Sequence, residues 1–166
     1  MQARFFHRIY ARAWKKKQLQ KYSGLLPELK ELVKGKTVLD YGIGKAWLWQ
    51  FLEKKGINAG KVYGIDLNEQ AVKPRKKGIN YYFSLQDFLK EKRKADLLVL
   101  FDAIHLMKKK ELLELKKLVK KNGKLLVSVP ASKKVLLHNL NWLGRTAWLK
   151  EIGLEEKDYC ALIKLS

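Results

Sequence analysis

Two acids and two glycines stand where apolar segments of this sequence end, and they are the residues best placed to do chemistry. Asp40 ends one apolar segment and is followed by Gly42 and Gly44, and Asp66 ends the next such segment. Glycines in a turn let the backbone come close to a ligand, and a carboxylate can accept hydrogen bonds from hydroxyl groups. The pattern predicts a ligand-binding loop. Two structural alternatives stand beside it: a turn that needs glycine only for its geometry, and a carboxylate that only caps a helix.

Two well-known nucleotide-binding loops can be tested against the same residues. A Walker A loop requires a second glycine at a fixed distance upstream of Lys45 and a serine or threonine directly after it; the sequence has neither, and Ala46 occupies the latter position. A dinucleotide fingerprint requires glycine where the sequence has Trp47, which would obstruct the close helix packing. The sequence therefore argues against a P-loop and against binding of NAD.

The segment VLDYGIGKA at 38–46 resembles the first motif of the class I S-adenosylmethionine-dependent methyltransferases, a strand that ends in an acid and is followed by G-x-G-x-G. The match departs from that motif at Ala46, which replaces the third glycine. The resemblance implies that S-adenosylmethionine is the cofactor and that Asp40 fixes its ammonium group, directly or through water. It also implies that Gly42 and Gly44 form the floor of the site.

Two further segments resemble the parts of these methyltransferases that hold the adenosine. The segment KVYGIDLN implies that Asp66 binds the ribose hydroxyls and that Leu67 lies beside the adenine. The segment INYYFSLQDFL resembles the strand that ends near an acid reading the adenine amino group, which implies this role for Asp87 or Gln86. Helix capping is the alternative interpretation of Asp87.

The segment ADLLVLFDAIHLM at 95–107 resembles the fourth motif of the family, which lies beside the reactive methyl group. Phe101 is thereby expected at the cofactor, and Asp102 and His105 are the candidate catalytic residues on the substrate side. Histidine can act as a base because its unperturbed pKa is about 6.5; the alternative for His105 is a packed side chain. The cofactor is already activated, so the protein mainly aligns a nucleophile behind the methyl group, and no metal is expected.

The elements that position these residues alternate between short apolar runs and helical patterns. This alternation predicts an α/β fold, a doubly wound and mostly parallel sheet with helices on both faces, as in the Rossmann-like methyltransferases. Ligands of such sheets bind at the carboxyl ends of the strands, where the glycines and acids stand. The expected strands are 37–41, 61–66, 79–83, 96–101 and 124–129, the expected helices are 45–55, 68–76, 86–93, 108–120 and 133–151, and residues 154–165 have room for one or two short strands.

The N-terminal part of the sequence is basic and amphipathic. Residues 1–24 contain no acid and seven bases, and they predict a helix that ends by Ser23-Gly24, followed by a second helix from Pro27 to about Lys34. We expect a helical extension over 1–35 and an S-adenosylmethionine-binding methyltransferase domain over 36–166. At 100° per residue one side of the first helix carries the proposed RNA-binding residues, Arg4, Arg8, Arg12 and Lys15, and the other carries Phe6, Ile9, Tyr10, Ala13 and Trp14. Peripheral membrane contact and a lid with its basic face outward are the alternatives.

Charge favours a polyanionic partner. The sequence has 36 Lys plus Arg against 16 Asp plus Glu, a net charge of +20, and we expect a substrate of structured RNA, either ribosomal or transfer RNA. Enzymes that methylate exocyclic base nitrogens commonly carry Asp or Asn before Pro-Pro and an aromatic at the fourth motif, a pattern that FDAIH lacks. That segment looks more like small-molecule methyltransferases. A small-molecule, lipid or protein acceptor, or a non-catalytic binding module, are the competing hypotheses.

The remaining composition predicts a globular cytoplasmic protein. Hydrophobic residues make up 47% of the chain, which excludes a disordered protein, and no Cys/His cluster has zinc-ligand spacing. Cys160 is the single cysteine, so it cannot form an intramolecular disulfide, and we expect it to be a buried structural thiol rather than a nucleophile. The basic N-terminus lacks the apolar stretch of a secretory signal, and no apolar run reaches the ~18 residues that span a bilayer.

Overall fold

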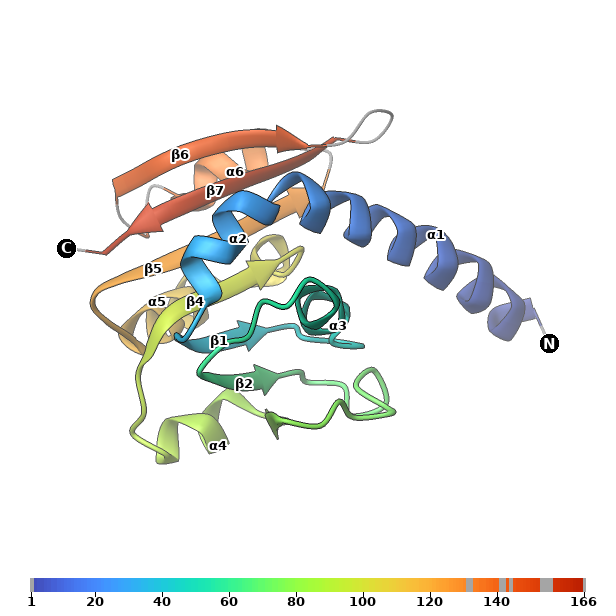
Figure 1. Cartoon of the computed structure of the whole chain (residues 1–166), viewed down its shortest axis with the longest axis horizontal. Coiled ribbons are helices and arrows are strands. Elements are labelled where there is room, and N and C mark those ends of the chain that lie inside the picture. The colour runs from blue at the N-terminus through green and yellow to red at the C-terminus, as the bar shows by residue number, and fades with distance from the viewer. Residues whose placement is uncertain (1, 131–132, 141–142, 144, 153–156, 166) are drawn as a thin grey trace.

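The chain forms one sheet with the strand order β3-β2-β1-β4-β5-β7-β6, in a computed structural model that describes residues 2–130, 133–140, 143, 145–152 and 157–165. All neighbouring strands are parallel except in the two pairs made by β7, which runs against the others. Figure 1 shows the parallel strands pointing toward the side from which the N-terminal helix projects. The strands are β1 (Thr37–Tyr41), β2 (Lys61–Ile65), β3 (Ile79–Tyr82), β4 (Ala95–Phe101), β5 (Val119–Pro130), β6 (Arg145–Ile152) and β7 (Asp158–Lys164).

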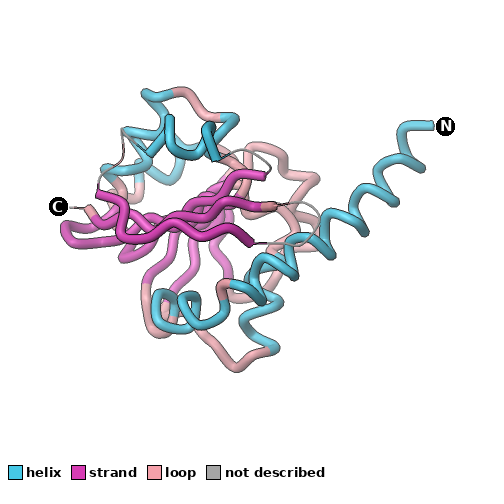
Figure 2. The backbone as a smooth tube through the Cα atoms, turned by 90° about the horizontal axis from the view of Figure 1, so that it is seen from above, coloured by secondary structure: helices cyan, strands magenta, loops and turns pink. Residues whose placement is uncertain are grey.

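Helices cover both faces of this sheet (Figure 2). The helices α1 (Gln2–Gly24), α2 (Leu26–Val33) and α3 (Trp47–Lys54) contribute to the core on one face, and α4 (Leu85–Lys90), α5 (Lys109–Lys117) and α6 (Lys133–Leu140) to the core on the other. A short 3₁₀ helix, Ile104–Leu106, follows β4. The predicted doubly wound α/β class, a mostly parallel sheet between two helical layers, is confirmed.

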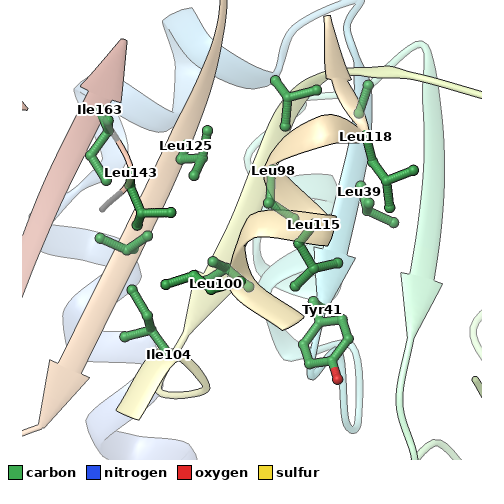
Figure 3. Close-up of a cluster of buried hydrophobic side chains, with 14 of the residues drawn as sticks. Leu39, Tyr41, Leu98, Leu100, Ile104, Leu115, Leu118, Leu125, Leu143 and Ile163 are labelled. Carbon is green, nitrogen blue, oxygen red and sulfur yellow. The ribbon is translucent and has the colours of Figure 1, made fainter. Parts of the chain in front are cut away.

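The strands read as near-continuous apolar runs because both of their faces are buried. In β1, Val38 packs into the core shared with α3, whereas the next residue, Leu39, packs into the core shared with α5. Figure 3 shows Leu98 and Leu100 of β4 in one cluster with Leu115 of α5. Complete burial of such a leucine side chain is worth about 1.5–3 kcal/mol, so these two cores hold the carboxyl ends of the strands in fixed positions.

The predicted helix at 68–76 is wrong, because these residues form turns. Pro74 supplies no backbone donor, and a residue that precedes proline is disfavoured in helical conformation. The side-chain oxygen of Asn68 accepts a hydrogen bond from the backbone N–H of Gln70 at 3.0 Å. This local bond gives the backbone a turn in place of the first turn of a helix.

The predicted helix at 133–151 is correct only in its first part, since α6 ends at Leu140 and β6 covers Arg145–Ile152. Residues 141–142 and 144 of that prediction lie outside the described residues. Trp148 packs against one core and Leu149 against the other, as successive side chains of a strand do. The strand expected within 154–165 is β7, which pairs antiparallel with β6 and β5. The predicted helix at 108–120 is also too long, because β5 begins at Val119.

The two N-terminal helices are confirmed, and part of them belongs to the body of the protein. Tyr22 and Leu25 are buried in the same core as Leu52 of α3. A Cβ atom added to Gly24 would lie 2.8 Å from Cγ2 of Ile152, so the end of α1 approaches β6 too closely for a larger residue. The N-terminal half of α1 projects beyond the sheet in both views (Figures 1 and 2). A domain boundary at residue 35 stays a prediction.

Candidate active site

The glycine loop leaves β1 at the carboxyl edge of the sheet and is tied to the end of β2. The backbone N–H groups of Gly42 and Ile43 donate hydrogen bonds to the carbonyl oxygen of Ile65, at 2.8 and 3.2 Å. Gly42 has a φ of +82°, and a Cβ atom there would lie 3.3 Å from the Cβ of Ala103 after β4. Glycine is therefore required at this position for its conformation and for the close approach of two strand ends.

Ala46 adopts the conformation that a third glycine would adopt. Its φ is 55° and its ψ is 34°, in the left-handed region, directly before α3. Its side chain is only 2% exposed and packs in the core. The left-handed conformation costs a non-glycine residue about 1–2 kcal/mol, so the packing of Ala46 must offset this cost.

Asp66 lies beyond the end of β2 and links the two loops at this edge. Its Oδ2 accepts a hydrogen bond from the backbone N–H of Gly44, and its Oδ1 accepts one from the N–H of Asn68, both at 2.9 Å. Because no helix begins at Asn68, Asp66 does not cap a helix; it accepts a hydrogen bond from the first residues of a turn instead. An ionised carboxylate has about four lone-pair sites, so two hydrogen bonds leave acceptor capacity for hydroxyl groups of a ligand.

Asp40 is a buried acid with one side-chain partner. The indole Nε1 of Trp49 donates a hydrogen bond to its Oδ2 at 2.7 Å, and the residue is 5% exposed. Burial raises the pKa of Asp40 to about 7, the Trp49 hydrogen bond opposes the rise, and the negative charge of Asp66 adds to it. A ligand cation beside Asp40 would favour the ionised form. Trp49 was not predicted as a partner of Asp40, although it lies only three residues beyond the motif that carries this acid.

The residues expected around an adenine lie at the surface. Leu67 is 66% exposed, which is unusual for a large apolar side chain. Asp87 forms a capping box at the start of α4: its backbone N–H donates to Oγ of Ser84 at 3.0 Å, and that hydroxyl donates to its Oδ2 at 2.7 Å. Lys90 and Ser84 hydrogen bonds lower the pKa of Asp87. Capping therefore accounts for Asp87, and adenine reading by Asp87 or the exposed Gln86 stays a prediction.

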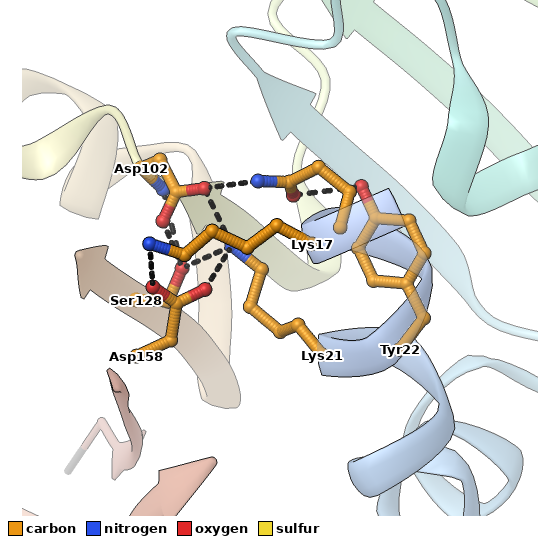
Figure 4. Close-up of polar contacts among 7 residues, drawn as sticks. Lys17, Lys21, Tyr22, Asp102, Ser128 and Asp158 are labelled. Carbon is orange, nitrogen blue, oxygen red and sulfur yellow. Dashed lines mark hydrogen bonds and ion pairs between the residues drawn. The ribbon is translucent and has the colours of Figure 1, made fainter. Parts of the chain in front are cut away.

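Asp102 lies after β4 and holds three side-chain donors (Figure 4). Its Oδ2 accepts from Nζ of Lys21 at 2.5 Å and from Nε2 of Gln18 at 2.6 Å, and its Oδ1 accepts from the Ser128 hydroxyl at 2.8 Å. Burial by itself would raise the pKa of Asp102, but the charge of Lys21 and these hydrogen bonds lower it. Asp102 is thus an ion-pair partner of α1, and its predicted catalytic role stays a prediction.

A second acid, Asp158 at the start of β7, completes this cluster. Its Oδ2 lies 3.2 Å from Nζ of Lys21, and its Oδ1 lies 3.4 Å from Nζ of Lys17. Lys21 is 1% exposed and Asp158 is 2% exposed, so both charges are withdrawn from water. Phe101 borders the cluster, with Lys21 Nζ 5.2 Å from its ring centre. Two lysines balance two aspartates here, as buried charges require.

Sequence analysis missed the residues of α1 that enter this edge of the sheet. Trp14, Gln18, Lys21 and Tyr22 share one side of a helix at 100° per residue, and a base between two aromatic residues on that side was the signal. His105 is exposed in the 3₁₀ turn after β4. Of the residues proposed to bind RNA, Arg12 and Lys15 are exposed, and Arg4 and Arg8 lie in the projecting half of α1.

The profile of a methyltransferase domain family matches residues 7–156 of the sequence. The chain belongs to this methyltransferase family. The match begins within the N-terminal segment and extends through the glycine loop, Asp66, and the segment after β4. The resemblance to class I methyltransferases and the predicted enzyme class are confirmed at the level of family and fold. No curated protein sequence matched the chain.

Solved structures share the fold at low sequence identity. The N-methyltransferase NodS from Bradyrhizobium japonicum superposes with a TM-score of 0.70 at 11% identity, over 91% of this chain and 96% of that one. A magnesium protoporphyrin IX methyltransferase from Synechocystis, which holds S-adenosylmethionine, gives 0.62 at 18% identity, over 88% and 79%. A Streptococcus mutans protein described as a putative methyltransferase gives 0.64 at 13% identity, over 83% of this chain but only 47% of its own length.

The described residues form neither a membrane-spanning helix nor a cluster of metal ligands. None of the described helices of this methyltransferase is long and apolar enough to cross a membrane. The part of the chain that the structure describes also holds no group of three His, Cys, Asp or Glu that could bind a metal ion. The acids at the carboxyl edge are instead engaged by Trp49, Lys21 and backbone N–H groups.

Proposed function

We propose that the protein is an S-adenosylmethionine-dependent methyltransferase that acts on structured RNA, either ribosomal or transfer RNA. The cofactor part rests on Asp40, a buried acid whose pKa is raised to about 7. Asp40 lies beside the glycine loop, whose backbone a ligand can approach closely because Gly42 and Gly44 carry no side chains. A site with an unneutralised buried acid suits a ligand that brings its own cation, and S-adenosylmethionine carries an ammonium and a sulfonium group. The residues present therefore fit the cofactor.

Each residue of the cofactor side then has a separate task. Asp40 would accept the ammonium group, Gly42 and Gly44 would allow the backbone to lie against the ligand, and Asp66 would accept from the ribose hydroxyls. Bound S-adenosylmethionine supplies an activated methyl group that a nucleophile can take without a metal. Asp102 already accepts from three side chains. We therefore assign removal of a proton from the acceptor, where one must leave, to the exposed His105.

The RNA part rests on where the exposed bases lie. Parallel strands place the loops that follow them at one edge, the edge that also carries the glycine loop. Exposed bases follow β1, β2, β4 and β5, and α1 carries further exposed bases. These bases are Lys45, Lys73, Arg75, Lys77, Lys108, Lys109, Lys110, Lys133, Lys134, Arg12, Lys15 and Lys16. Phosphate binding by such residues supplies most of the non-specific affinity for RNA.

A small-molecule, lipid or protein acceptor is the second candidate. This candidate is favoured by the position of α1, which lies across the ends of β4 and β5 and is held there by the bonds of Lys21 to Asp102 and Ser128. A helix in this position leaves less room for a large acceptor beside the methyl group. The magnesium protoporphyrin IX methyltransferase, which shares the fold, is by its name an enzyme with a porphyrin acceptor. Transfer of tritium from labelled cofactor to fractionated cellular RNA, protein and lipid separates the two candidates. Label in RNA supports the proposal, whereas label only in another fraction replaces it.

RNA binding is tested by the salt dependence of its affinity. Replacement of Arg4, Arg8, Arg12 and Lys15 by Gln should lower the affinity and flatten the plot of log affinity against log salt, by up to about 0.7–0.9 per lost phosphate contact. The matched control replaces four exposed lysines far from the site by Gln: Lys34, Lys54, Lys55 and Lys94. Equal effects in both variants would indicate nonspecific attraction. Cofactor binding, measured by calorimetry, should remain unchanged in both.

A further inference from the structure

The most unusual side chain of the fold is Lys21, a base buried as deeply as the leucines of the core. It is 1% exposed and belongs to the C-terminal half of α1. A buried ammonium is tolerated only where it is paired and hydrogen-bonded. Nζ of Lys21 meets that condition with three partners: Asp102 at 2.5 Å, Asp158 at 3.2 Å and the Ser128 hydroxyl at 3.2 Å. Lys21 therefore ties α1 to the part of the sheet that carries Asp102, Ser128 and Asp158, where we place the methyl acceptor.

These partners come from three adjacent strands. Asp102 follows β4, Ser128 belongs to β5, and Asp158 begins β7, which are neighbours in the sheet. Lys17, one turn earlier in α1, reaches Asp158 at 3.4 Å. The lysines thus hold α1 across the carboxyl edge, as Figure 4 shows for Lys17, Lys21, Asp102, Ser128 and Asp158. The helix cannot shift along this edge without separating buried charges.

The same helix turn carries Tyr22, which lies against the end of β4. In the proposal, Asp40, the glycine loop and Asp66 form the cofactor half of the site, and Asp102 and its partners form the acceptor half. The ring of Tyr22 stacks on Phe101 with centroids 5.7 Å apart, and its hydroxyl donates to Oε1 of Gln18 at 3.1 Å. Burial raises the pKa of Tyr22 well above its usual value, and the charges of Asp40, Asp102 and Asp158 add to the rise. The ring of Tyr22 also lies 5.8 Å from that of Phe51 of α3, so Tyr22 packs between α3 and the end of β4.

We propose that Lys21 is a positioning residue for methyl transfer: by anchoring α1 to Asp102 and Asp158 it holds the buried Gln18 and Tyr22 behind the partly exposed ring of Phe101, and so fixes the wall against which the acceptor is aligned. The inference rests on the proposed methyltransferase activity. Alignment of the nucleophile is the main task left to the protein by an activated methyl donor, and a displacement of about 1 Å can lower a rate about a hundredfold. Lys21 acts through this wall and takes no part in bond formation.

The competing explanation is that Lys21 only stabilises the fold, and the chain offers a matched control for it. Lys150 of β6 bonds Glu28 of α2, so it also joins the N-terminal helices to the sheet through an ion pair. Among the described residues, Lys150 forms no ion pair with Asp40, Asp102 or Asp158. Lys150→Met should weaken the attachment of these helices without disturbing the acceptor wall.

The experiment compares the variants Lys21→Met, Lys21→Arg and Lys150→Met with the natural protein. A fourth variant, Lys21→Met with Asp158→Asn, removes one positive and one negative charge and keeps the test usable if Lys21→Met does not fold. Methyl transfer from tritium-labelled cofactor, at a saturating concentration, to bulk transfer RNA and to bulk ribosomal RNA is measured, and cofactor affinity is measured by calorimetry. We expect both Lys21→Met variants to lose about tenfold to a hundredfold in kcat/KM for the acceptor, with cofactor affinity within about threefold of natural. Lys21→Arg should recover part of that loss, and Lys150→Met should lose less than about threefold.

A loss in Lys150→Met equal to that in Lys21→Met, or a Lys21→Met enzyme with natural kcat/KM, would overturn the inference. Amide hydrogen exchange gives a second readout that needs no acceptor. Exchange in residues 14–24 should accelerate at least about tenfold in the folded Lys21→Met, Asp158→Asn variant and much less in Lys150→Met, since an anchored helix turn opens less often. If the natural protein transfers no methyl group, the proposed function fails, and unchanged exchange would separately show that Lys21 does not anchor α1.

Discussion

Asp40 and Asp102 are largely buried acids at the same edge of one sheet, yet their pKa values shift in opposite directions. The pKa of Asp40 rises to about 7 because burial is opposed only by the Trp49 hydrogen bond. The pKa of Asp102 falls because Lys21, Gln18 and Ser128 outweigh the burial that would raise it. In the proposed cofactor half of the site, a ligand cation would favour the ionised form of Asp40, whereas in the proposed acceptor half Asp102 is paired with Lys21 of α1. A strand-end acid does not by itself reveal which of these roles it has.

The largest effect should come from removing the cation of the acceptor half. Lys21→Met leaves two buried carboxylates without their common partner, and loss of one member of a buried ion pair costs about 3–5 kcal/mol of unfolding free energy. Urea denaturation followed by circular dichroism at neutral pH measures this loss. The paired variant Lys21→Met, Asp158→Asn should lose less, because it leaves one carboxylate fewer unpaired. A loss below about 1 kcal/mol in Lys21→Met would mean that these charges remain hydrated.

The next largest effect tests the cofactor half. Asp66→Ala removes the acceptor of the Gly44 N–H and the proposed ribose contact, and we expect S-adenosylmethionine affinity to fall by about 1–3 kcal/mol. Calorimetric titration of the folded variant measures the change. Asp87→Ala is the comparison: if Asp87 only caps α4, its loss leaves cofactor affinity unchanged, and a weaker affinity would instead support its predicted contact with adenine. Natural affinity in Asp66→Ala would remove Asp66 from the site.

A pH dependence of cofactor binding should follow from Asp40. Its pKa of about 7 means that it is mostly protonated at pH 5.5, so an ammonium group can bind there only after a proton leaves. Affinity should therefore rise about tenfold from pH 5.5 to pH 7, a range in which an α-amino group, with a pKa of about 7.7–8.0, remains charged. Asp40→Asn should bind more weakly and lose this pH dependence. A flat profile in the natural protein would show that Asp40 does not face the ammonium.

The same shifts affect the stability of the cofactor-free protein with opposite signs. The folded-state pKa of Asp40 is raised, so its contribution is favourable at low pH and is lost as pH rises from about 4 to about 7. The folded-state pKa of Asp102 is lowered, so its contribution is present above the unfolded pKa of about 3.9 and is lost as pH falls below it. Denaturation curves of Asp40→Asn and Asp102→Asn across this range separate the two contributions.

The smallest effect should come from Ala46, where one favourable contribution to stability is nearly cancelled by two unfavourable ones. Ala46→Gly relieves a left-handed alanine, worth about 1–2 kcal/mol. It also removes a buried methyl group, which lowers the unfolding free energy by about 0.8 kcal/mol. The greater conformational entropy of glycine in the unfolded chain lowers it further, by about 0.4–1 kcal/mol. We expect unfolding free energy within about 1 kcal/mol of natural and unchanged cofactor affinity, measured by denaturation and calorimetry. A large gain in affinity would mean that alanine distorts the loop, contrary to its observed dihedral angles.

Much of the cofactor half could be predicted because its signals are local. Asp40 and Asp66 end apolar runs, the glycines follow at short spacing, and parallel strands bring their carboxyl ends to one edge whatever the details of packing. Strand β1 was predicted with its observed bounds for the same reason. The predicted helix at 68–76 was wrong although the signals there are also local. Pro74 and the side chain of Asn68 both favour turns, and the prediction gave them too little weight.

The acceptor half was decided by tertiary structure. Trp148 and its neighbours suit a helix or a strand, and they form β6 because β7 offers an edge whose backbone groups need partners. Lys21 reads as one base among seven in a basic helix, but it is separated by 81 residues from Asp102 and is buried because that acid and Asp158 lie where α1 crosses the sheet. The sequence by itself determined the strand ends and the loop that leaves them, since these depend on neighbouring residues. The pairing of buried charges depends on which distant elements meet, because a charge leaves water only where another charge is already held in place to receive it.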